Sequence, residues 1–196
     1  MKNKITHNTI ILVYLLILSS CALFQKKNKV QLQPAQLVSI KAIDLSEDRS
    51  TLSSNNDEIL VSIFFGSQQD KIWYFNGYRL ETMEFDSAHS NYTLDSVELS
   101  TDFDCQDCTA FICLTEIDTD GSEDSTHAAL ERLLNTVGYK ALDTKSMVDT
   151  ALPDNDFLGV IKLPYFVPEM GTEYRIEGKD LLDSYAYDIK ISIKSK

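Results

Sequence analysis

Acidic residues gather in four clusters along this chain, and each cluster adjoins a stretch with the pattern of a β-strand. The clusters are Asp44, Glu47 and Asp48; Asn55, Asn56 and Asp57; Glu116, Asp118, Asp120, Glu123 and Asp124; and Asp154 and Asp156. If the strands alternate in direction, all four clusters can lie at one end of a domain. Hard cations such as Ca²⁺ bind six to eight oxygens at about 2.3–2.6 Å, which converging loops can supply. The spacing therefore predicts a calcium site built from several loops.

Metal-free interpretations of the same residues remain open. Carboxylates solvate the surface of a soluble domain, and Glu123 and Asp124 fall where the N-terminus of a helix favours negative charge. The loop 116–121 also begins like an EF-hand, with the order Glu-x-Asp-x-Asp-Gly. That motif fails further on, because Glu123 replaces an apolar residue and His127 replaces a bidentate glutamate. The loop therefore indicates a local acidic turn at most.

Cys105 and Cys108 have the CxxC spacing of redox enzymes and of half a zinc site. The chain has no second CxxC, however, and its three histidines do not complete a zinc ligand set. Aspartates at 102, 104 and 107 would raise the pKa of a thiol, which disfavours a reactive thiolate. We therefore expect free thiols or a structural disulfide, in which Cys105 pairs with Cys108 or with Cys113.

Sequence motifs of catalysis are missing from the chain, which has no GxSxG, SxxK, HExxH or glycine-rich phosphate loop. Outside the N-terminal leader, His89 and His127 are the histidines available for acid and base chemistry. Acidic pairs are too common to single out the two carboxylates of a glycosidase. We therefore expect a non-enzymatic protein.

The N-terminus has the pattern of a bacterial lipoprotein signal. Two lysines precede an apolar run at 10–18, which ends in the sequence Leu-Ser-Ser-Cys at 18–21. The run is shorter than the roughly 20 residues that a membrane-spanning helix needs, and a small-residue cleavage site follows it. The resemblance implies that residues 1–20 are removed and that Cys21 carries the lipid.

Two or three acyl chains on Cys21 would make a permanent membrane tether. By resemblance to Gram-negative systems, Ala22 stands where an inner-membrane retention signal carries Asp, which implies a periplasm-facing outer-membrane lipoprotein. The segment 21–36 is polar and contains Pro34, so we expect a flexible stalk. The remaining residues, 37–196, suit one domain with its own core.

The acidic balance limits the classes of partner. The formal net charge is -12, and it becomes -14 when the two lysines of the leader are removed. This charge argues against nucleic acid and against direct attraction to anionic lipid. The expected partners are the membrane, through the lipid anchor, and a protein of the cell envelope; the oligomeric state stays open.

Most of the domain alternates apolar and polar residues with the period of a β-strand. Val38, Ile40 and Ala42 predict one buried strand face, and Tyr187, Ile189, Ile191 and Ile193 predict another. The dipeptide Asn76-Gly77 predicts a hairpin turn between flanking aromatic segments. The strand candidates are 38–42, 59–65, 73–75, 78–80, 92–99, 110–117, 157–163, 174–177 and 187–193.

One stretch has helical spacing instead. Leucines and valine recur between 126 and 137, Asp124 or Ser125 can cap the start, and Gly138 can end the helix. The helix lies between two predicted strands. The fold class that we expect is therefore all-β, an antiparallel β-sandwich with one inserted α-helix.

Three segments of this order resemble a C2 domain, the calcium-dependent β-sandwich of membrane-targeting proteins: 56–61, 113–120 and 154–161. The resemblance covers roughly 37–163. It implies a C2-like sandwich whose loops bind calcium. The positions that match the ligands of the family are Asp48, Asp57, Asp118, Asp120 and Asp156.

The chain also departs from the C2 pattern. Glu58-Ile59 stands where the family usually has Pro-Tyr, and 35 residues separate Asp120 from Asp156, where the family has a loop of a few residues. A metal-independent alternative therefore stays open: a structural accessory subunit of an envelope or secretion complex.

Aromatic residues near Asn76-Gly77 are candidates for partner contact, because strand alternation points some of them outward. They are Trp73, Tyr74 and Tyr78. A role in the core is the alternative for each of them. The functional hypothesis is thus an anchored binding module, with or without calcium.

Overall fold

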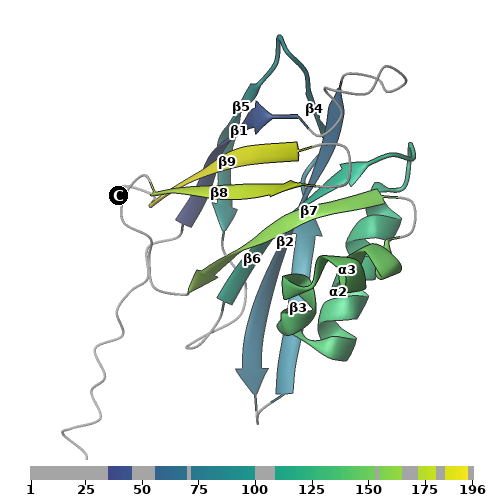
Figure 1. Ribbon diagram of the computed structural model, residues 1–196. Coiled ribbons are helices and arrows are strands. Elements are labelled where there is room, and N and C mark those ends of the chain that lie inside the picture. Colours follow the sequence, from purple (N-terminus) through teal and green to yellow (C-terminus); the bar gives the residue numbers. More distant parts are fainter. Residues whose placement is uncertain are drawn as a thin grey trace, which may run out of the picture. The chain divides into compact units, whose positions relative to one another are not determined.

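Among the described residues of the computed structural model, nine strands form two antiparallel sheets (Figure 1). The first sheet has the order β5-β1-β9-β8, and the second has the order β3-β2-β6-β7, with β4 paired to β2. The strands are β1 (Ala35–Asp44), β2 (Asp57–Gln69), β3 (Ile72–Arg79), β4 (Met83–Phe85), β5 (Asn91–Leu99), β6 (Thr109–Ile117), β7 (Asn155–Pro164), β8 (Thr172–Lys179) and β9 (Ser184–Ile193). The structure describes residues 35–45, 56–69, 72–99, 109–152, 155–164, 172–179 and 184–193.

The predicted all-β sandwich with a helical insertion is confirmed. The connection between β6 and β7 contains α2 (Glu123–Val137), η1 (Tyr139–Asp143) and α3 (Lys145–Ala151). The sequence predicted a helix at 126–137, but α2 starts earlier because the N–H of Thr126 already bonds to the carbonyl of Ser122 at 2.8 Å. Gly138 ends α2 as predicted, with a φ of 94° and its N–H bonded to the carbonyl of Leu134. The short η1 and α3 were not predicted.

The second sheet is buried on both of its faces. One face packs on the first sheet in a core that includes Ile63 and Leu114 of the second sheet and Tyr187 of the first. The other face packs on the helical insertion through Phe64 and Phe111. Figure 1 shows α2 and α3 beside β3 and β2. Burial on both faces explains why β2 and β6 read as nearly continuous apolar runs.

The inward face of β1 differs from the prediction by one residue. Leu37, Ile40 and Ala42 are buried, whereas Val38 is only partly buried. The pairing of β1 with both neighbouring strands shifts register between Leu37 and Ser39, and such an irregularity changes which side chains face the core. In β9 the predicted alternation is confirmed for Tyr187, Ile189 and Ile191, which are fully buried.

The predicted hairpin turn at Asn76-Gly77 is wrong. Both residues lie inside β3, opposite Phe65 and Phe64 of β2. The chain reverses between Gln69 and Ile72, which pair with each other. Glycine is needed at 77 because a Cβ atom there would lie 2.3 Å from the carbonyl oxygen of Ile63. The dipeptide thus marks a close approach of two backbones and not a turn.

Candidate functional site

Four of the predicted site residues lie outside the described residues: Cys21, Asp48, Cys105 and Cys108. Lipidation, the disulfide and the first-loop calcium ligand therefore stay predictions. The remaining cysteine, Cys113, is a buried free thiol on the helix-facing side of the second sheet. Burial raises its pKa, so this thiol is unreactive.

Strand pairing brings three of the acidic clusters to one end of the second sheet. Ile59 of β2 pairs with Glu116 of β6, and Glu116 pairs with Asp156 of β7. The beginning of β2 at Asp57 and the residue that follows β6, Asp118, therefore lie at the same end as Asp156. Asp118, Asp120 and Asp156 are exposed.

Asp57 differs from these residues because its side chain is fully buried. The hydroxyl of Tyr187, on β9 of the other sheet, donates a hydrogen bond to Asp57 Oδ2. Burial raises the pKa of Tyr187, and the nearby charges of Asp57, Glu116 and Asp44 raise it further. The hydroxyl therefore keeps its proton and remains a donor. This bond uses one oxygen of the predicted ligand to join the two sheets.

Asn155 is a polar hub that was not among the predicted site residues. Its Oδ1 accepts hydrogen bonds from the backbone N–H of Asp118 at 2.9 Å and from Ser122 Oγ at 3.2 Å. Its Nδ2 donates to Thr126 Oγ1 at 2.9 Å. The side chain thus attaches the loop after β6 and the first turn of α2 to β7. An amide supplies both a donor and an acceptor, whereas the ionised side chains of the flanking aspartates can only accept.

The exposed carboxylates near this end repel one another. The pKa of Glu58 is raised, first by partial burial and then by the charges of Asp120, Glu84 and Glu123. Within the described parts of the chain, no group of three or more His, Cys, Asp or Glu side chains converges closely enough to hold a metal ion.

No protein-family model and no curated protein matches the chain. The resemblance to C2 domains thus remains a prediction from the sequence motifs alone. In the part of the chain that the structure describes, no helix is long and apolar enough to cross a membrane.

Ser62 and His127 form a pair with the residue types of nucleophilic catalysis. His127 Nδ1 lies 3.0 Å from Ser62 Oγ, although the two residues are 65 positions apart, so no local motif could reveal them. Ser62 is fully buried within β2, between β3 and β6. An acylating serine must meet its substrate. The pair therefore serves to attach α2 to the sheet.

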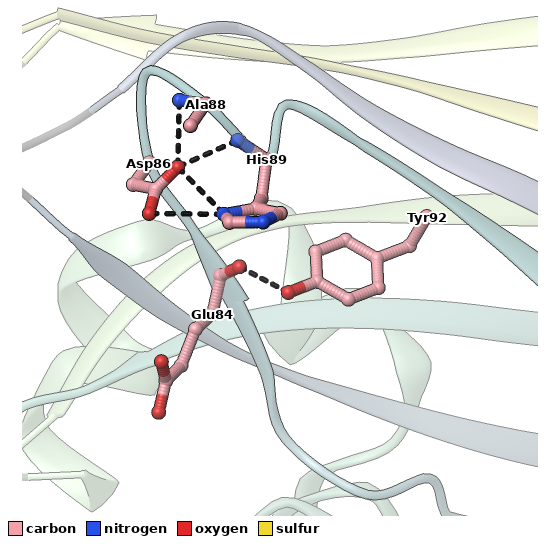
Figure 2. Close-up of polar contacts among 5 residues, drawn as sticks. All are labelled: Glu84, Asp86, Ala88, His89 and Tyr92. Atoms are coloured by element: carbon pink, nitrogen blue, oxygen red, sulfur yellow. Dashed lines mark hydrogen bonds and ion pairs between the residues drawn. The ribbon is translucent and has the colours of Figure 1, made fainter.

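His89 belongs to an exposed turn between β4 and β5 (Figure 2). Asp86 Oδ1 accepts hydrogen bonds from the backbone N–H of Ala88 at 2.7 Å and lies 3.1 Å from His89 Nδ1. The side-chain bond to His89 is the main reason why the pKa of Asp86 is lowered. The hydroxyl of Tyr92 donates to the carbonyl of Glu84 beside this turn. These contacts account for His89 as a residue that stabilises the turn.

The three aromatic candidates for partner contact have different environments. Trp73 is partly buried and packs edge-on against Tyr139 of the helical insertion, with ring centroids 5.2 Å apart. Tyr78 is partly buried and packs on the core between the sheets. Tyr74 has 52% of its surface exposed. Of the three, Tyr74 offers the largest exposed surface.

Tyr74 lies on a two-stranded ribbon. Among the described residues, the last pair between β2 and β6 is Gly66 with Thr109, and three further pairs of β2 with β3 follow it, the first being Ser67 with Tyr74. Figure 1 shows β2 and β3 running together past the neighbouring strand β6. The ribbon thus carries an exposed aromatic ring beyond the rest of the sheet.

Proposed function

We propose that this chain is a lipoprotein of the cell envelope whose β-sandwich acts as a non-enzymatic, metal-independent module that binds another envelope protein. The lipoprotein pattern at 18–21 supports the anchor. The observation that carries the binding proposal is Tyr74, a half-exposed aromatic residue on a ribbon of two strands.

Two physical arguments support a role of the ribbon in binding. Tyrosine is enriched at protein interfaces, because its ring buries a large area and its hydroxyl still finds a polar partner. A two-stranded ribbon is only marginally stable by itself in water, so contact with a partner would stabilise it. The metal-independent form of the proposal is supported by Asp57, which is buried and bonded to Tyr187.

Site-specific photocrosslinking of the full lipidated chain in cells tests this proposal. A photoreactive amino acid at position 74 should give a discrete adduct with an envelope protein. The matched control is position 173, an exposed glutamate on β8 of the first sheet, which should give none. Tyr74→Ala should also reduce recovery of the captured protein. Equal adducts at both positions, or none at 74, would overturn the proposal.

Calcium binding is a second candidate function. It is favoured by the like charges around Glu58, which a bound cation would partly neutralise. A cation near Asp118 and Asp120 would reduce the like-charge effect that raises the pKa of Glu58. Millimolar calcium should then raise the unfolding temperature of the chain by several degrees relative to excess EDTA. Asp118→Asn with Asp120→Asn should abolish the shift. If the unfolding temperature does not change with calcium, the calcium-binding proposal is wrong. The proposal of partner binding through Tyr74 would not be affected.

A further inference from the structure

His127 sits between α2 and the second sheet. Its ring stacks on the ring of Phe64 of β2, with centroids 4.8 Å apart and an interplanar angle of 8°. Its Nδ1 meets the fully buried hydroxyl of Ser62, and the imidazole also makes a hydrogen bond with the backbone of Gly77 in β3. One side chain of α2 is thus in contact with two strands of the sheet.

The same helix covers the outward edge of β3. Asn135 Oδ1 accepts a hydrogen bond from the N–H of Phe75 at 3.1 Å, and Asn135 Nδ2 donates to the carbonyl of Phe75 at 3.3 Å. The amide therefore occupies both backbone groups of Phe75, as a neighbouring strand would. Unpaired edges are templates for further strands, so native proteins cover them. The position of α2 decides whether this edge is accessible.

The surroundings of His127 disfavour a positive charge. Burial is the largest effect, and it lowers the pKa of His127. Glu131 and Asp124 of its own helix and the hydrogen bond to the backbone of Gly77 act to raise this pKa, and Arg79 of β3 acts to lower it. The contacts from β2, Ser62 and Phe64, are uncharged. The pKa of His127 is lowered overall.

Protonation would also disturb the hydrogen bond to Ser62. A neutral imidazole has one donor and one acceptor nitrogen, whereas a protonated one has two donors. Ser62 would then have to accept from His127 and direct its own proton elsewhere, inside the fully buried interior of the sheet. Both the lost hydration of the charge and this rearrangement favour separation of α2 from the sheet.

We propose that His127 is a pH-sensitive latch: its neutral ring holds α2 on the second sheet, and protonation under mildly acidic conditions loosens α2 and uncovers the edge of β3 at Phe75. Opening transfers the imidazolium into water, where its charge is hydrated. The latch is independent of any partner at Tyr74 and of any calcium site.

The direction of the pH response follows from proton linkage. The pKa of His127 in the closed state is below its ordinary value of 6.5, so the open state binds more protons in the interval between the two. The attachment of α2 is therefore complete above pH 6.5 and weakens as the pH falls through that interval. The opening equilibrium can increase by up to about tenfold per pH unit.

Amide hydrogen exchange of the full lipidated chain in detergent, at pH 7.5 and 5.5 and corrected for the intrinsic exchange rate, tests the latch. Amides of α2 and the amide of Phe75 should exchange faster at pH 5.5, while those of β9 should not change. This pH leaves Asp124 ionised, because its bond to Arg79 lowers its pKa below the ordinary 3.8.

Two variants complete the test. His127→Gln keeps a polar, uncharged side chain and should remove the pH response, whereas the matched control His89→Gln should retain it. Equal exchange at the two pH values, or a response that survives in His127→Gln, would overturn the proposal. If His127→Gln does not fold, an NMR titration of the unaltered chain decides, since the Phe75 amide must then follow the titration of the His127 ring.

Discussion

The hydroxyl of Tyr187 in β9 donates a hydrogen bond to the carboxylate of Asp57 in β2, so a buried polar contact joins the two sheets. A buried carboxylate without a donor is costly, because the charge loses its hydration. The bond therefore ties the start of β2 to a single position relative to the first sheet.

Tyr187→Phe should test the strength of this tie. The substitution keeps the ring and removes one hydrogen-bond donor from buried Asp57, so we expect a loss of about 1–3 kcal/mol in the free energy of unfolding. Urea unfolding at neutral pH measures it. Tyr92→Phe is the matched control, because the hydroxyl of Tyr92 bonds to the carbonyl of Glu84 in an exposed setting. A loss no larger than in this control would show that the buried contact contributes little.

Thr115→Val should preserve or raise stability. Among the described residues, Thr115 Oγ1 is the buried side-chain oxygen or nitrogen for which no hydrogen-bond partner is present. Replacing an unsatisfied hydroxyl by a methyl group of similar size removes a desolvation cost of about 1 kcal/mol or more. Thr126→Val should instead lower stability, because it removes the hydroxyl that accepts a hydrogen bond from Asn155. Differential scanning calorimetry should give shifts of opposite sign, and a marked loss for Thr115→Val would refute the argument.

Asn155→Asp should destabilise the helical insertion. A carboxylate cannot donate to Thr126, so we expect a loss of about 1–3 kcal/mol together with faster amide exchange in the first turn of α2. Asp156→Asn makes the reverse change at the next, exposed position and should stay within about 0.5 kcal/mol of the unaltered protein. Similar effects of the two substitutions would contradict the role of Asn155 as a hub.

The proposed lipid anchor predicts that Cys21→Ser abolishes incorporation of labelled palmitate and releases the chain from the membrane fraction. Lipidation requires the thiol at this position, whereas Cys113 is buried in the folded domain. Cys113→Ala should therefore keep the label. A labelled Cys21→Ser variant would show that the signal at 18–21 has been misinterpreted.

Local sequence signals were enough to predict the sandwich, because most strands show either an alternation or a continuous run of apolar residues. The alternation of Tyr187, Ile189 and Ile191 and the glycine that ends α2 are local signals of this kind. The turn at Asn76-Gly77 failed because the need for glycine comes from Ile63 on the neighbouring strand. The propensity of a dipeptide cannot report a contact between strands.

The contacts at the candidate sites were harder to predict than the strands, because they join residues that are far apart in the sequence. The position of Asp57 at the start of a strand was predicted, but its bond to Tyr187 joins residues 130 positions apart. The contact between Ser62 and His127 likewise joins residues that are 65 positions apart. For Asn155 the only sequence signal was an amide between two aspartates, which could have suggested a hydrogen-bonding role distinct from theirs.

The whole helical layer comes from one connection, between β6 and β7, and this has a consequence for how such a domain can diverge. A variant that exchanged the connection for a short loop would expose the aromatic rings of Phe64 and Phe111 to water. Loss of the insertion would therefore require simultaneous polar replacements on two strands. We therefore expect homologues to have either both the helical connection and the aromatic residues that it covers, or neither.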